Sequence, residues 1–163
     1  MTFHLHRIAD LAVFAIANAI NLLLIVMFLA RARKSQAVEK AAGLAVVVMA
    51  FPLAAAAVIS AAGHRAWWTW GLPLFMVFFC VVEYLVDYAM KIKFRDTRAM
   101  KPYLILYYLA LMSLIGYSFL LGKSYGYVTL ATYFLHMAAT AYSYGRVKHG
   151  DQGPTGTAPL DPF

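Results

Sequence analysis

The sequence contains few charged residues and a single cysteine. Charged side chains make up 13% of its 163 residues, against about 25% in soluble domains. With 63% hydrophobic residues, the chain has more apolar surface than a soluble core can bury. The lone Cys80 excludes an intrachain disulfide and a paired-cysteine redox site. Neither a glycine-rich nucleotide loop nor a metalloprotease His-Glu helix occurs in the sequence, which therefore favours a non-enzymatic protein.

Apolar runs dominate what is present, and each is close to the roughly 20 residues that cross a bilayer as a helix. They predict an all-α integral membrane protein, in which residues 1–149 form a single bundle of five transmembrane helices. The tail at 150–163 is rich in Gly and Pro and has no core-forming pattern. The first run lacks a small-residue cleavage site, so we expect no cleaved signal peptide. The predicted helices cover residues 8–30, 41–62, 70–90, 102–121 and 125–144.

Lys and Arg residues are distributed unevenly among the connecting segments. Four follow the first apolar run, five follow the third and two follow the fifth, whereas only three lie in the remaining segments. The positive-inside rule then places the N-terminus outside and the C-terminus in the cytoplasm of a plasma or inner membrane. The net charge of +7 comes from these short clusters, so we expect no nucleic-acid partner.

Helix direction makes the depth of each residue in the membrane readable, at about 1.5 Å per residue. Glu83 and His136 fall at nearly the same depth, and Asn18, Asn21 and Ser113 share that layer. An ionised Glu in hydrocarbon costs several kcal/mol, so Glu83 should face the interior of the bundle. Two interpretations stay open: a site for a proton, a cation or a polar ligand, and a structural hydrogen-bond cluster.

The third run ends in charged residues that suit the cytoplasmic interface. Asp87 and Lys91 are four residues apart, which predicts an ion pair at the end of the helix. The basic stretch that follows predicts contact with anionic lipid headgroups. Its residues are Lys91, Lys93, Arg95, Arg98 and Lys101.

Three further groups of residues are weaker candidates. Tyr117 and Tyr133 lie deep enough to line a pocket for a lipid- or quinone-like ligand, although core packing with one hydrogen bond is the better explanation. His4, His6 and His64 share the outer face, but no thiol or carboxylate joins them, so we expect no metal site. A haem between His64 and His136 is disfavoured by a depth difference of about 15 Å. We expect no cofactor, with haem or quinone as alternatives.

The sequence leaves three functions open. The first is a non-enzymatic subunit or anchor of a larger membrane complex, packed against other subunits or copies of itself. The second is a small proton- or cation-coupled transporter or channel in which Glu83 titrates. The third is a lipid- or quinone-binding membrane protein.

Overall fold

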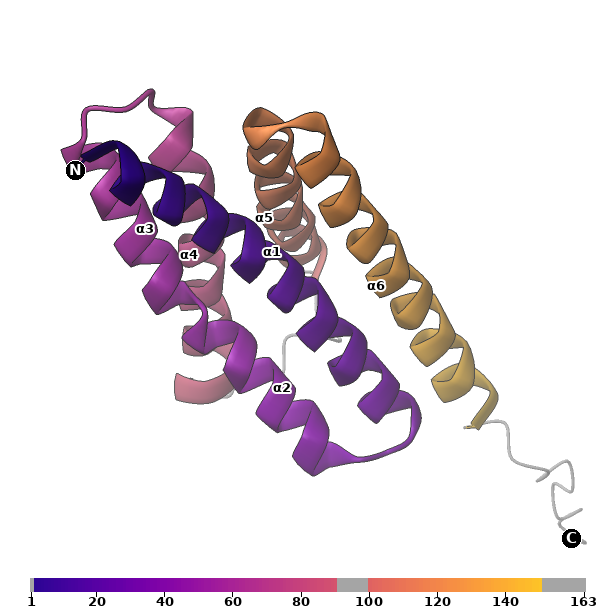
Figure 1. The fold of residues 1–163 in the computed structure, drawn as a ribbon. Coiled ribbons are helices and arrows are strands. Elements are labelled where there is room, and N and C mark those ends of the chain that lie inside the picture. Colours follow the sequence, from indigo (N-terminus) through magenta and orange to yellow (C-terminus); the bar gives the residue numbers. More distant parts are fainter. Residues whose placement is uncertain (1, 91–99, 151–163) are drawn as a thin grey trace, which may run out of the picture.

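The computed structural model describes residues 2–90 and 100–150, which form five antiparallel helical passes (Figure 1). The upper end of the bundle in this view holds the start of the first helix, the connection at residues 63–67 and the tight turn at Gly122. The lower end holds the connection at residues 33–35 and the end of the last helix. The elements are α1 (Thr2–Ala32), α2 (Gln36–Val48), α3 (Ala50–Ala62), α4 (Trp68–Glu83), the π-helix η1 (Tyr84–Ala89), α5 (Met100–Leu121) and α6 (Lys123–Gly150).

Helix α1 is the central element, and it packs against α2, α3, α5 and α6. Its buried side chains recur every three or four residues, which places them on one stripe of the helix. Small residues in this stripe let the neighbouring helices approach closely. The stripe contains Ala9, Val13, Ala17, Ile20 and Leu24.

The second predicted helix, 41–62, is divided at Met49 into α2 and α3. Pro52 is the third residue of α3 and has no backbone N–H to donate to Val48. The regular pattern resumes where the Leu53 N–H donates to the Met49 carbonyl at 3.3 Å. Proline therefore explains why one pass consists of two short helices.

The third predicted helix, 70–90, is also composite, because α4 changes into the π-helix η1 directly after Glu83. A π-helix widens the hydrogen-bonded turn by one residue and is found disproportionately at functional sites. The sequence carries no pattern that predicts this change.

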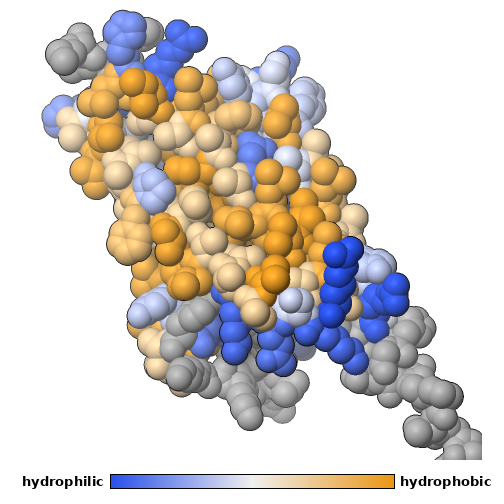
Figure 2. Space-filling view, turned by 60° about the horizontal axis from the view of Figure 1, so that its bottom comes forward, coloured by the Kyte–Doolittle hydropathy of each residue, from blue (hydrophilic) through white to orange (hydrophobic). Residues whose placement is uncertain are grey.

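Four segments are long and apolar enough to cross a membrane: His4–Ala32, Gln36–Ala62, Trp68–Asp87 and Met100–Leu121. Large apolar side chains on these segments face outward, including Phe51, Val58 and Ile105. Figure 2 shows the result as a hydrophobic band between two hydrophilic ends. The protein is thus an all-helical bundle with the outer surface of a membrane protein.

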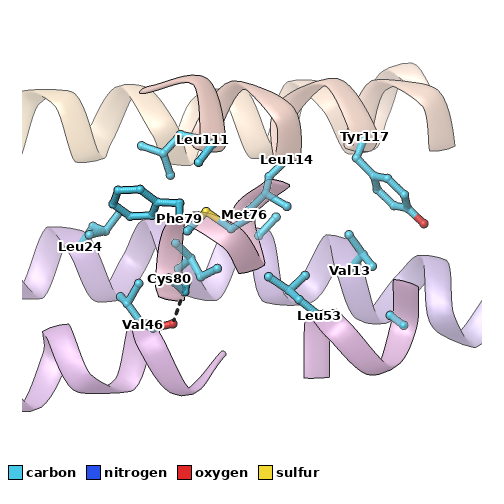
Figure 3. Close-up of a cluster of buried hydrophobic side chains, with 14 of the residues drawn as sticks. Val13, Leu24, Val46, Leu53, Met76, Phe79, Cys80, Leu111, Leu114 and Tyr117 are labelled. Atoms are coloured by element: carbon cyan, nitrogen blue, oxygen red, sulfur yellow. Dashed lines mark hydrogen bonds between the residues drawn. The ribbon is translucent and has the colours of Figure 1, made fainter. Parts of the chain in front are cut away.

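The core of the bundle is a continuous apolar layer between its two ends. Figure 3 shows Leu53, Met76 and Leu114 between Phe79 on one side and Tyr117 on the other. The side chains of Leu53, Met76 and Leu114 are at most 2% exposed. Cys80 belongs to the same cluster, and its thiol lies 3.8 Å from the Val46 carbonyl oxygen. This layer separates the polar groups of the upper end from those of the lower end.

Candidate ligand-binding cavity

A cavity of about 720 Å³ opens at the lower end of the bundle. Residues of α1, α2, α4, η1, α5 and α6 contribute to its wall. Leu24, Val46 and Phe79 form apolar parts of the wall and are almost completely buried. The charged residues that line it are Arg31, Glu39, Lys40, Glu83 and Asp87. The cavity therefore combines a deep apolar wall with charged groups.

Glu83 stands at the point where α4 becomes η1, and its carboxylate lines the cavity. The Tyr103 hydroxyl of α5 donates a hydrogen bond to Glu83 Oε2. Asp87 follows within η1 and lines the same cavity. Both acids of this pass therefore line one cavity, as their spacing of four residues favours.

His136 lies behind the cavity wall, and it is 0% exposed. Its Nε2 lies 2.7 Å from the hydroxyl of Tyr107, which lines the cavity. The rings of Phe28, Tyr107 and Tyr133 surround the imidazole, with centroid distances of 5.6, 5.9 and 6.0 Å. Among the residues that the structure describes, His136 Nδ1 has no hydrogen-bond partner.

Glu83 and His136, which the sequence places at one depth, are thus linked through α5. Their partners Tyr103 and Tyr107 are four residues apart and lie on the same side of that helix. The cavity directly contacts Glu83 and both tyrosines, but not His136. Neither tyrosine was among the candidate residues that the sequence analysis selected by their depth in the membrane.

Asn18 and Asn21 form a separate polar contact between α1 and α6. The Asn21 amide donates to Thr132 Oγ1 at 2.9 Å, and the Thr132 hydroxyl is 2.9 Å from Asn18 Oδ1. The Asn18 amide also reaches Thr129 Oγ1 at 3.2 Å. None of these residues lines the lower cavity, so here the structural interpretation is the better one.

Ser113 likewise joins two helices. Its hydroxyl lies 2.7 Å from the Ala110 carbonyl oxygen of α5 and 3.1 Å from the Leu72 carbonyl oxygen of α4. Leu72 precedes Pro73, which interrupts the hydrogen bonding of α4. Ser113 therefore supports helix packing near a proline and does not line the lower cavity.

A second cavity, of about 350 Å³, lies at the upper end beside an ion pair. Arg65 donates to both carboxylate oxygens of Asp10, at 2.6 and 3.0 Å. The Tyr117 hydroxyl donates to Asp10 Oδ1 at 2.6 Å. The hydrogen bond to Asp10 raises the pKa of Arg65, which lies in the connection between α3 and α4. This cluster fastens α1 to α5 and to the α3–α4 connection.

The sequence candidates omitted Asp10 and Arg65, although a signal was available. Asp10 is an acid within the first apolar run, and such a residue needs a partner at or near the membrane. Tyr117 belongs to this ion-pair cluster, whereas Tyr133 lies next to His136.

His4 and His6 lie near the start of α1, and His64 lies in the connection that follows α3. The described parts of the chain contain no group of three or more His, Cys, Asp or Glu residues that could hold a metal ion. The His6 ring packs against Gly63 so closely that a Cβ atom there would overlap it. His64 is exposed in the connection after α3.

Most of the predicted interfacial charges lie outside the described residues. Lys91, Lys93, Arg95 and Arg98 belong to this part of the chain, so the predicted Asp87–Lys91 pair and most of the headgroup contacts stay predictions. Lys101 is exposed at the start of α5.

Comparison with known proteins adds no relative. No family model, no curated protein and no solved structure matches this chain. The case for a function therefore depends on the cavity and its side chains.

Proposed function

We propose that this chain is a five-span membrane protein that binds an amphipathic ligand in its lower cavity. The observation that carries the proposal is the cavity of about 720 Å³, which lies within the range of about 300–1,000 Å³ typical of small-molecule sites. Its wall combines apolar side chains such as Leu24 and Phe79 with the hydrogen-bonding groups of Glu83, Tyr103 and Tyr107. Such a wall matches a molecule with an apolar body and a polar head.

Helix α6 supplies the fifth span in this proposal. Its 28 residues give a length of about 42 Å at 1.5 Å per residue, and it packs against α1 and α5. By sequence, eleven Lys and Arg residues belong to the connections and helix ends of the lower end, against three at the upper end. The positive-inside rule then places the lower cavity on the cytoplasmic side.

A bulky side chain in the cavity wall tests the proposal. Leu104 lines the cavity, while its neighbour Ile105 is 61% exposed on the outer surface of α5. Leu104→Trp should fill part of the cavity, and Ile105→Trp adds the same side chain on the lipid-facing side. Mass spectrometry of small molecules retained by the purified proteins should detect a ligand in wild type and in Ile105→Trp, and much less in Leu104→Trp. Equal retention by the two variants, or none by wild type, would refute ligand binding at this cavity.

Transport is a second candidate, because the two cavities open at opposite ends of the bundle. Tyr107 lines the lower cavity and Tyr117 the upper one, and they are about 15 Å apart along α5 at 1.5 Å per residue. The buried core around Leu114 closes the space between them. This arrangement suits alternating access better than an open channel. Proton or cation flux into liposomes should fall in Glu83→Gln, and flux that is absent or unchanged would remove this candidate.

The hypothesis of an accessory subunit stays a prediction from the sequence. Apolar side chains are exposed on each of the four apolar spans. Lipid chains cover such surfaces as well as a protein partner does.

A further inference from the structure

The hydrogen bond between Tyr107 and His136 can be made with its proton on either side. If the Tyr107 hydroxyl donates, then the neutral imidazole carries its proton on Nδ1. That N–H would be buried with no acceptor among the described residues. If Nε2 carries the proton and donates, then Nδ1 is only an unused acceptor. The Tyr107 hydroxyl proton then needs another acceptor, which the cavity lined by Tyr107 can supply, whereas His136 lines neither cavity. Because a buried N–H group without an acceptor is costly, the second arrangement is favoured.

The second arrangement assigns a direction to the Tyr107 hydroxyl. Its oxygen accepts the hydrogen bond from His136 Nε2, which leaves its own proton to be donated elsewhere. Tyr107 lines the lower cavity next to apolar wall residues such as Leu24 and Phe79. The cavity thus contains a hydrogen-bond donor in an apolar setting, where such a bond discriminates strongly.

Resting on the proposed ligand-binding function, we infer that the lower cavity binds a neutral molecule whose carbonyl oxygen accepts a hydrogen bond from Tyr107. His136 is a positioning residue, because it holds the hydroxyl in the donating orientation without lining the cavity. An anionic head is disfavoured, because the acids that line the cavity (Glu39, Glu83 and Asp87) outnumber the bases (Arg31 and Lys40), and Arg31 already pairs with Glu39. Two classes of membrane molecule share this chemistry: quinones and acyl esters of glycerol.

Three probes separate the two classes from simple hydrophobic binding. Decylbenzoquinone carries quinone carbonyls, monolaurin carries one ester carbonyl, and decylbenzene has a comparable tail without an acceptor. Binding to the purified full-length protein can be measured by competition against a retained or radiolabelled probe. Wild type should bind at least one carbonyl probe about tenfold more tightly than decylbenzene, a difference of about one hydrogen bond. The preferred probe identifies the class.

Substitution of the donor gives the first test of the inference. Tyr107→Phe should weaken the preferred carbonyl probe about tenfold and leave decylbenzene unchanged. Tyr133→Phe is the matched control, because its ring also packs on His136 but does not line the cavity. Equal binding of the carbonyl probe by Tyr107→Phe and Tyr133→Phe would overturn the inference.

Substitution of the positioning residue gives the second test. The amide nitrogen of Gln can take the place of His Nε2, whereas that of Asn corresponds to Nδ1. His136→Gln should therefore retain the preference for the carbonyl probe, and His136→Asn should lose it. Loss in both or retention in both would contradict the positioning role. If all three probes bind wild type equally and Leu104→Trp still blocks them, then only the carbonyl inference fails and ligand binding stands. If no probe binds and none is retained, then the proposed function fails.

Discussion

Tyr107 and Tyr117 lie on the same helix, and each hydroxyl reaches a polar side chain of another helix. Tyr117 donates to Asp10, whose two oxygens also accept both hydrogen bonds from Arg65. Both oxygens of the Asp10 carboxylate are therefore used within the protein. Both tyrosines line a cavity, but in the favoured arrangement Tyr107 accepts a hydrogen bond from His136, so its own hydroxyl proton stays available to a ligand.

The comparison shows how one residue type serves two purposes. The upper cluster stabilises the fold, because removing any member leaves a partner without its hydrogen bond. An unsaturated group beside a cavity is available to a ligand. The difference arises from the partner helix: α1 offers a carboxylate at the upper end, while α6 offers an imidazole at the lower end.

The largest expected effect comes from breaking the upper cluster at its centre. Asp10→Ala should destabilise the protein by about 2–3 kcal/mol, because Arg65 and Tyr117 both lose their acceptor. This is less than the roughly 3–5 kcal/mol expected for a fully buried pair, since the Arg65 and Asp10 side chains are 25% and 20% exposed. The measurement is equilibrium unfolding of the purified protein by detergent titration.

The matched control at the lower end is Glu39→Ala. Glu39 pairs with Arg31 at 2.8 Å, and the two side chains have similar exposure to the upper pair, but a single carboxylate oxygen is used. We expect a cost of at most about 1 kcal/mol. Equal costs for Asp10→Ala and Glu39→Ala would show that the upper cluster has no special structural role.

The next largest effect compares the two tyrosines directly. Tyr117→Phe should cost about 1.5–2 kcal/mol, because it removes a hydrogen bond to a charged group. Tyr107→Phe should cost about 1 kcal/mol. Adding the preferred carbonyl probe should raise the melting temperature of Tyr117→Phe by the same amount as that of wild type, and that of Tyr107→Phe by less. If the probe raised the melting temperature of both variants equally, Tyr107 would have no special role in ligand binding.

A smaller effect concerns the charge of the upper cluster. Arg65→Lys should cost about 1 kcal/mol, because an ammonium group cannot reproduce the two-pronged contact with Asp10. The Asp10 hydrogen bond raises the pKa of Arg65, and a raised pKa stabilises the fold below the unfolded value and loses this effect only as pH rises through the folded one. The stability difference between wild type and Arg65→Met should therefore stay constant from about pH 7 to about pH 10. If the stability difference disappeared within this pH range, the Asp10 hydrogen bond would not raise the pKa of Arg65.

The smallest effect is expected in the polar contact between α1 and α6. The coupling energy of Asn21 and Thr132, from a double-mutant cycle with Asn21→Leu and Thr132→Val, should be about 0.6 kcal/mol. Neither substitution should change binding of the carbonyl probe, since neither residue lines the lower cavity. A coupling above about 2 kcal/mol or a loss of binding would give this contact a larger role than we assign.

The helices themselves could be predicted because they depend on local patterns. The helix predicted at 102–121 is Met100–Leu121 in the structure, whereas the helix predicted at 41–62 is divided at Met49, three residues before Pro52. The last helix extends beyond the predicted 144 to Gly150, because apolar character ends there before helical structure does. Hydropathy thus locates membrane helices but not their ends.

The site was harder to predict, because depth along a helix says nothing about rotation around it. Glu83 and His136 do lie near one side of α5, but each bonds to a tyrosine that also fits an interface role. Asn18 and Asn21 share the predicted depth and face α6 instead of the lower cavity. Rotation is set by the packing of all five passes together, and no single run carries that information.

The joint at Met49 divides the second pass into halves with different neighbours. Gln36, Glu39, Lys40, Gly43 and Val46 of α2 all line the lower cavity, whereas α3 contributes none of its lining residues. Helix α3 has its own buried side chains, among them Leu53 and Ala57. The two halves of this pass therefore differ in what they build: α2 forms one side of the lower cavity, while α3 contributes side chains to the bundle core.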